Sequence, residues 1–172
     1  MNTLALDLGT KTGFAIKCET NKVVDGPYSA TTYTVASGTW ALSDPKAITQ
    51  ARVEGWDRKC DPRFNALCLH IEEAVDDCDI KAVVFEDILF GSTSMQSHLW
   101  ATFRAAIWAV KRAKNFEVDC INSSTLKKYA TGHGGATKQM MAAHLLKGHL
   151  FGLDFVKNPK PTASCFLLRK TG

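Results

Sequence analysis

The sequence predicts an α/β domain built on a mixed five-stranded sheet that is flanked by helices. Short apolar runs near the N-terminus are separated by turn residues, which favours a three-stranded meander. The rest of the chain alternates between helical spacings of apolar residues and apolar, β-rich runs. A meander followed by alternating helices and strands is typical of a layered α/β domain. Because the chain has 172 residues and no internal repeat, we expect residues 1–172 to form one domain.

Three segments of the N-terminal part make up the predicted meander. Residues 4–8 are apolar apart from one carboxylate, residues 9–13 form a turn bounded by glycines, and residues 14–16 resume an apolar strand. Residues 19–34 are polar and rich in turn formers, so we expect a loop there. Residues 35–42 predict the third strand.

The central part of the chain contains one predicted helix and one predicted strand. Residues 43–62 show no periodic pattern and are expected to be irregular. Apolar residues at helical spacing over 64–75 predict a helix with one buried face. Residues 81–85 are a β-rich run of the kind found in buried parallel strands.

The C-terminal part of the predicted fold begins with a long helix whose N-cap is Ser92, Thr93 or Ser94. A glycine-rich loop precedes the final helix. The predicted elements are a helix over 95–110, a strand over 116–121, a short helix over 124–129 capped by Ser124, and a helix over about 136–147.

The composition is that of an ordinary globular protein, with 45% hydrophobic and 22% charged residues. No apolar run approaches the ~20 residues that span a bilayer, and the N-terminus lacks a basic segment followed by an apolar one. We therefore expect a soluble, cytoplasmic protein with no membrane partner. The 6 cysteines include no CxxC pair and no zinc-ligand spacing, so we expect free, buried thiols.

Charge is distributed unevenly along the chain. Residues 1–103 hold 9 Lys and Arg against 14 Asp and Glu, a balance of −5. Residues 104–172 hold 12 Lys and Arg against 3 Asp and Glu, a balance of +9. A basic half suits a polyanionic partner such as DNA, because neutralising phosphates releases condensed counterions. The alternative is a solvated basic surface that only keeps the protein in solution.

Asp7 and Glu86 are carboxylates in otherwise apolar strands. Burying a carboxylate is costly unless it is paired, protonated or bound to a metal. If their strands are parallel neighbours, both carboxylates project near one edge of the sheet. Hard oxygen ligands placed in this way suit Mg²⁺ or Mn²⁺. The alternative is that each carboxylate pairs with a lysine or caps a turn.

The turn sequence GTKTG at 9–13 allows a second interpretation. Glycine turns with Thr and Lys are similar to the phosphate loops of sugar kinases and actin-like ATPases, which begin with an Asp-x-Gly-Thr pattern. The sequence contains no GxxxxGK[ST] motif, which excludes a P-loop. A two-lobed ATPase also needs a much longer chain, so the ATPase interpretation is the weaker one.

Four segments together resemble the RuvC-like crossover-junction endonucleases of phages. They read LALDLGTKTGFAI at 4–16, SGTWAL at 37–42, VVFEDILFG at 83–91 and INSSTLKKYATGHGGATKQMM at 121–141. The resemblance extends from residue 3 to about residue 155. The first segment is also found in YqgF-like proteins, whereas the last segment is more specific to the junction endonucleases.

The resemblance implies an RNase H-like fold, a homodimer, and a metal site in each protomer that cuts strands of a four-way DNA junction in a bacterial or phage-infected cell. By position, Asp7 corresponds to the first catalytic carboxylate and Glu86 to the second. Lys127 and Lys138 correspond to basic residues near the scissile phosphate, and Lys138 is the catalytic one. Mg²⁺ or Mn²⁺ is the implied cofactor, since metal ions activate water and stabilise the leaving oxygen.

Further residues are candidates for contacts with branched DNA. Lys11 and Lys128 lie in the matching segments, and His133 lies in the glycine loop. Leu89 and Phe90 are candidates for an apolar wedge at the junction point, because the family places an aromatic residue near there. Trp100, Phe103 and Trp108 have two interpretations, which are stacking on bases and packing in the core or a dimer interface.

The C-terminal segment 156–172 departs from the family pattern. The family closes its metal site with acidic residues at the start of its last helix, and Lys157 and Asn158 stand about where those acids belong. Three accounts remain open. Asp154 substitutes as the third metal ligand, the segment is an altered reading of a longer gene, or the domain binds DNA without cutting it. His149 is either a neutral metal ligand or a surface histidine.

Three functions therefore compete at the level of sequence. The first is a metal-dependent, structure-selective endonuclease that resolves branched DNA, impaired if the acidic motif is lost. The second is a catalytically inactive module that binds branched DNA. The third is an RNA-processing nuclease similar to the YqgF-like proteins.

Overall fold

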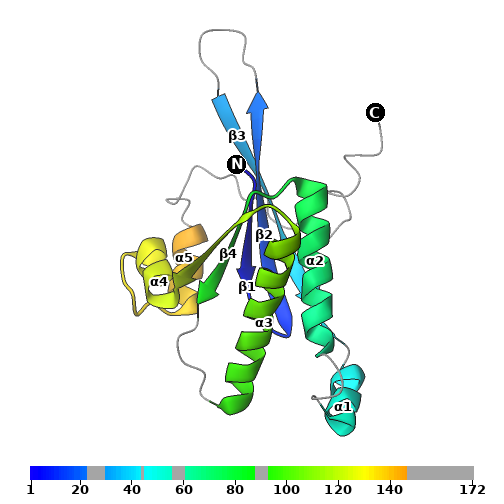
Figure 1. Cartoon of the computed structure of the whole chain (residues 1–172). Coiled ribbons are helices and arrows are strands. Elements are labelled where there is room, and N and C mark those ends of the chain that lie inside the picture. Colours follow the sequence, from blue (N-terminus) through cyan, green and yellow to red (C-terminus); the bar gives the residue numbers. More distant parts are fainter. Residues whose placement is uncertain (23–29, 44, 56–60, 88–92, 147–172) are drawn as a thin grey trace.

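The computed structural model describes residues 1–22, 30–43, 45–55, 61–87 and 93–146 (Figure 1). The strands in these ranges form a five-stranded sheet with the order β3-β2-β1-β4-β5. The predicted number of strands is confirmed. The strands are β1 Thr3–Asp7, β2 Lys11–Lys22, β3 Ala30–Ala41, β4 Ala82–Asp87 and β5 Glu117–Asn122.

The sheet is mixed, as predicted. Strand β2 pairs antiparallel with β1 on one side and with β3 on the other. Strand β4 pairs parallel with both β1 and β5. The N-terminal strands therefore form the expected meander, and the later strands are joined to the sheet through helices.

Five helices accompany the sheet in the described part of the chain. Figure 1 shows α2 and α3 side by side over one face of the sheet, whereas α4 and α5 lie on the side of β4 and β5, away from that pair. The helices are α1 Pro45–Glu54, α2 Pro62–Cys78, α3 Ser94–Ala113, α4 Ser123–Thr131 and α5 Lys138–Leu146.

The core lies between the sheet and the helices α2 and α3. Leu4 and Leu6 of β1 are buried, whereas Ala5 and Asp7 between and after them are exposed. This alternation is the consequence of the period-two geometry of a strand. The helices contribute buried residues at helical spacing, which are Leu67, Ile71 and Ala74 of α2 and Phe103, Ala106, Ile107 and Val110 of α3. We call the face that carries Ala5 and Asp7 the outer face of the sheet.

The N-caps of α2, α3 and α4 are Asp61, Thr93 and Asn122, all of them residue types that favour this position. Asp61 accepts a hydrogen bond from the backbone N–H of Arg63 at the start of α2. Thr93 caps α3, so one of the predicted candidates is confirmed. The prediction that Ser124 caps α4 is wrong, because Asn122 accepts hydrogen bonds from both the backbone N–H and the hydroxyl of Ser124.

The prediction of a loop over 19–34 is wrong at both ends of that range. Strand β2 continues to Lys22 and β3 begins at Ala30, and the two remain paired up to Lys22↔Ala30. Threonine and tyrosine are abundant in this stretch, and both residue types favour strands despite their polarity. Cross-strand pairing therefore outweighs the polar composition that suggested a loop.

The prediction of an irregular segment over 43–62 is wrong for its central part. Helix α1 occupies Pro45–Glu54, begins with a proline and consists largely of good helix formers. Val53 of this helix is exposed. The helix has no apolar stripe in its sequence, so periodicity gave no sign of it.

The aromatic residues of α3 divide between the core and the surface. Phe103 is 1% exposed, and Trp100 packs edge-on against it with ring centroids 6.5 Å apart. Core packing is thus confirmed for both. Trp108 is 52% exposed and does not contribute to the core.

The thiols in the described part are less buried than the sequence suggested. Cys18, Cys68 and Cys78 are half-buried, and Cys120 is exposed, although none of the four is in a disulfide. The short strand β5 leaves Cys120 at the edge of the sheet. None of the described helices is both long enough and apolar enough to cross a membrane.

Gly38 is required by an aromatic stack on the helix-covered side. The ring of Phe14 lies against Gly38, where an added Cβ would be 2.9 Å from two ring atoms. Phe14 also stacks on Trp40, which stacks in turn on His70 of α2. Glycine at residue 38 therefore allows this stack to close over the strands β2 and β3.

Candidate functional site

Asp7 and Glu86 lie at the ends of neighbouring parallel strands. The paired part of β1 and β4 ends at Leu6↔Phe85, and each carboxylate follows in the next position of its strand. Asp7 lies two residues after Ala5, and Glu86 lies two residues after Val84, which is paired with Ala5. Both acids therefore share the outer face of the sheet. The prediction that the two acids lie on adjacent strands is confirmed, whereas the prediction that their carboxylates are close enough to share a metal stays a prediction.

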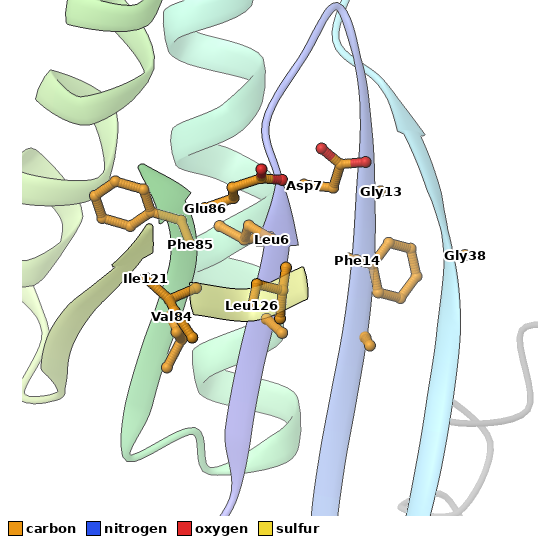
Figure 2. Close-up of a pocket in the computed structure, with 12 residues that line it drawn as sticks. Leu6, Asp7, Gly13, Phe14, Gly38, Val84, Phe85, Glu86, Ile121 and Leu126 are labelled. Carbon is orange, nitrogen blue, oxygen red and sulfur yellow. The ribbon is translucent and has the colours of Figure 1, made fainter. Parts of the chain in front are cut away.

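A cavity of about 440 Å³ opens on the outer face beside these two carboxylates. Figure 2 shows the Asp7 and Glu86 side chains at the same end of the cavity, with Glu86 extending toward the Asp7 carboxylate. The remaining wall is mainly apolar. It is lined by Ala5, Leu6, Gly13, Phe14, Ala15, Gly38, Val84, Phe85, Ile121 and Leu126.

The turn between β1 and β2 brings Gly13 directly across from Asp7. The Thr12 hydroxyl donates to the carbonyl of Gly9 at 2.8 Å, and Thr12 is fully buried. Its hydroxyl thus serves to close the hairpin. The GTKTG sequence forms this hairpin turn and the start of β2.

The donor set at this end of the cavity consists of carboxylate oxygens. Within the ranges that the structure describes, neither Asp7 nor Glu86 has a hydrogen bond or an ion pair, so the lysine-pairing alternative is not observed. No third His, Cys, Asp or Glu in those ranges joins them in a metal-binding cluster. Two carboxylates at one end of a cavity are the donor type that suits a hard cation such as Mg²⁺, which keeps several waters and accepts phosphate oxygens.

Helix α4 forms one border of the cavity. Leu126 lines the cavity, and Lys127 follows it in the chain as a half-buried residue. Lys128 and Lys138 are exposed, and Lys138 begins the neighbouring helix α5. The structure thus brings the helix that carries Lys127 to the cavity, and it places Lys138 on the adjacent helix.

Lys11 and His133 are both exposed. Lys11 begins β2, two residues before Gly13, which is the residue opposite Asp7. Residues two apart in a strand share a face, so Lys11 lies on the outer face. His133 lies in the turn after α4 and donates its backbone N–H to Thr131. Lys11 therefore shares a sheet face with the carboxylates, whereas His133 is on the α4–α5 connection.

Several predicted site residues lie outside the described part of the chain. They are Leu89, Phe90, His149, Asp154, Lys157 and Asn158. Their proposed roles as wedge, ligand or replaced acid stay predictions.

Two features of the site were not predicted from the sequence. The first is the apolar cavity wall, although the alternation of Ala5 with Asp7 and of Val84 with Glu86 carried that information. The second is an ion pair between Asp87, the residue after Glu86, and Arg104 of α3. No local pattern signals the second feature, because Asp87 and Arg104 lie on different elements.

Comparisons with known proteins agree with this architecture. No protein-family model and no curated protein matches the chain. A solved structure of Thermus thermophilus RuvC matches with a TM-score of 0.62 and 17% identity, covering 96% of this chain and 89% of RuvC. RuvC of T. thermophilus in complex with a Holliday junction substrate matches with a TM-score of 0.62 and 16% identity, covering 96% of this chain and 88% of that one. The chain therefore has the fold of RuvC, an RNase H-like mixed five-stranded sheet flanked by helices.

Proposed function

We propose that this chain is a metal-dependent, structure-selective endonuclease that binds four-way DNA junctions and hydrolyses their phosphodiester bonds. The observation that carries the proposal is the pairing of Asp7 and Glu86 at one end of a shared cavity. Support comes from the resemblance of the four sequence segments. It also comes from the likeness in fold to RuvC, one structure of which holds a Holliday junction substrate.

Asp7 and Glu86 would hold Mg²⁺ or Mn²⁺, with Asp154 proposed as a further ligand. A bound divalent cation activates water and neutralises charge on the phosphate. The chain itself supplies the two carboxylates, each at the end of a strand of the sheet. Lys138 and Lys127 would neutralise negative charge that develops on the phosphate oxygens.

The DNA would lie across the strand ends and the helices α4 and α5. Lys11, Lys127, Lys128, His133 and Lys138 are the proposed contacts in the described part, and Phe90 is the proposed wedge. Residues 104–172, with a balance of 12 Lys and Arg against 3 Asp and Glu, include four of these five contacts. Most of these contacts are with phosphates, so they provide affinity and position rather than sequence preference.

The functional unit would be a homodimer, which suits a junction with two equivalent strands to cut. Ala101, Ala105 and Trp108 are exposed on α3 at spacings of four and three residues, which places them on one helix face. Such a patch can pair with itself across a two-fold axis. Sedimentation of the wild-type chain as a dimer and of Trp108→Glu as a monomer would support this arrangement.

A second candidate function is a module that binds junctions without cutting them. The observation that favours it is the small donor set, since no third His, Cys, Asp or Glu of the described residues joins Asp7 and Glu86 in a metal-binding cluster. Mg²⁺ usually requires anionic protein ligands in near-octahedral geometry. If the chain does cut junctions, the same donor set predicts slow cleavage in Mg²⁺ and faster cleavage in Mn²⁺, which tolerates less ideal coordination.

The test compares a four-way junction, linear duplex DNA and a structured RNA as substrates. An endonuclease of the proposed type nicks the junction in Mn²⁺, leaves the duplex intact, and loses nicking but not binding in Asp7→Asn. Binding without any nicking in either metal would favour the second candidate. Cleavage of the RNA in preference to the junction would favour an RNA-processing nuclease.

A further inference from the structure

The last two residues of β4 are acids whose side chains lie on opposite faces of the sheet. Glu86 lines the cavity on the outer face, whereas Asp87 forms an ion pair with Arg104 of α3. Successive side chains of a strand point to opposite faces, and α3 packs on the helix-covered face. One strand end therefore connects a carboxylate of the site to the helix layer.

Strand β4 has less support at Glu86 than in its middle. Its pairing with β1 ends at Leu6↔Phe85, while its pairing with β5 continues to Asp87↔Asn122. Glu86 thus lies one position beyond the ladder that it shares with the strand of Asp7. The direction of its side chain depends on the backbone at residues 86 and 87, so an anchor on Asp87 acts directly on Glu86.

Arg104 is suited to be this anchor because its own helix is fixed by packing. Its neighbours Phe103, Ala106 and Ile107 are at most 1% exposed, and close-packed interiors leave little room for displacement. The Nε atom of Arg104 is buried and lacks a hydrogen-bond partner in the described part of the chain. The guanidinium is therefore partly desolvated, and its ion pair with Asp87 compensates its charge.

We propose that Arg104 is a positioning residue that, through Asp87, holds Glu86 in the orientation that binds the divalent cation. The proposal rests on the function proposed above. Arg104 acts through the ion pair and the backbone of β4, and it contacts neither metal nor DNA. Loss of either partner lets Glu86 adopt several orientations, so the cation loses affinity while the sheet remains folded.

The experiment measures Mn²⁺ affinity of the full chain without DNA, by titration with electron paramagnetic resonance detection of free Mn²⁺. The variants are Asp87→Asn, Arg104→Gln and the conservative Arg104→Lys. Substitution of residues that orient metal ligands typically weakens binding by about tenfold or more. We expect a loss of that size for Asp87→Asn and Arg104→Gln. Arg104→Lys should recover part of the affinity, since it keeps the charge but not the planar fork.

A matched control is available on the same helix layer. Lys114, at the C-terminus of α3, forms an ion pair of 2.7 Å with Asp76 of α2. We expect Lys114→Gln and Asp76→Asn to leave Mn²⁺ affinity unchanged. Melting temperatures without metal show whether each variant is folded, and the titrations are done well below the lowest of them.

The outcomes separate the positioning role from the metal site itself. Unchanged Mn²⁺ affinity in Asp87→Asn and Arg104→Gln, together with a loss in Asp7→Asn, would overturn the positioning role alone. An equal loss of affinity in the Lys114 and Asp76 variants would also overturn it, because the effect would then be one of general stability. Unchanged affinity in Asp7→Asn would overturn both the metal site and the inference that rests on it.

Discussion

Gly13 lies directly across from Asp7 in the antiparallel pair of β1 and β2. A Cβ atom added at Gly13 would lie 3.4 Å from the Cβ of Asp7 and 3.9 Å from its Oδ2. Both distances are ordinary van der Waals contacts. The position therefore has room for one methyl group beside the carboxylate, and a branched side chain would compete with the carboxylate for space.

The space beside Asp7 limits the size of the side chain that residue 13 can carry. Gly13→Ala should retain Mn²⁺ affinity, whereas Gly13→Val should lower it by displacing the Asp7 carboxylate. Valine suits a strand, so we expect little loss of stability from the backbone itself. Titration with Mn²⁺ and thermal unfolding of both variants check this, and equal affinities for alanine and valine would contradict it.

Gly38→Ala should destabilise the protein, because its Cβ would clash with the Phe14 ring at 2.9 Å. The ring cannot move freely, since it stacks on Trp40 with centroids 4.6 Å apart. We expect a loss of about 1–3 kcal/mol in the free energy of unfolding, the usual range for overpacking.

Denaturant unfolding measures this loss, with Ser37→Ala on the outer face as the control. Phe14→Leu removes the ring edge, so the double variant Phe14→Leu/Gly38→Ala should lose less than the sum of the two single losses. Strict additivity would show that the clash at Phe14 is not the cause.

Asp61 should make the stability of α2 depend on pH. Burial raises the pKa of Asp61, but hydrogen bonds from Arg63 and its charge outweigh this, and the net pKa is below its ordinary value. A depressed pKa contributes stability above the unfolded-state pKa, and that contribution is lost as pH falls through the folded-state pKa. Asp61→Ala should therefore cost about 1–2 kcal/mol at neutral pH, as loss of an N-cap typically does.

The difference between wild type and Asp61→Ala should shrink as pH falls from the unfolded-state pKa of an aspartate, about 3.9, through the lower folded-state pKa of Asp61. Unfolding measured across this pH range tests the sign. Asp77→Ala, an exposed change on the same helix, serves as the control. A difference that stays constant with pH would mean that the charge of Asp61 makes no contribution.

Lys127→Ala and Lys138→Ala should weaken junction binding and make it less dependent on salt. Each phosphate contact with duplex DNA contributes about 0.9 to the slope of log K against log salt. If both lysines contact phosphates, the double variant should lower the slope by about 2. Lys81→Ala is the control, because Lys81 pairs with Asp79 just before β4, at the end opposite Glu86. An unchanged slope in the double variant would place the DNA elsewhere.

Much of the fold was predictable because its core strands and helices follow strict periods. The strand of Asp7, the strand of Glu86 and the long helix α3 are all apolar at the spacing of their element, so their type and order could be derived. Helix α1 and the outer half of the β2–β3 pair could not be derived, because their stability depends on propensity and pairing rather than on an apolar face.

The candidate site was predictable in its two carboxylates but not in its surroundings. Asp7 and Glu86 are conspicuous because each interrupts an apolar strand, and parallel strands bring their carboxyl ends together. The contact of Arg104 with Asp87 depends on tertiary packing. No local pattern encodes a contact between residues that lie on different elements.

The central claim is that Asp7 and Glu86 form a metal site that cuts branched DNA. The most direct measurement is single-turnover cleavage of a four-way junction in Mn²⁺ by wild type, Asp7→Asn and Glu86→Gln, with junction binding measured in parallel. We predict nicking by the wild-type chain, loss of nicking in both variants, and unchanged binding in all three. Nicking that persists in Asp7→Asn and Glu86→Gln, or no nicking by the wild type in either Mn²⁺ or Mg²⁺, would contradict the claim.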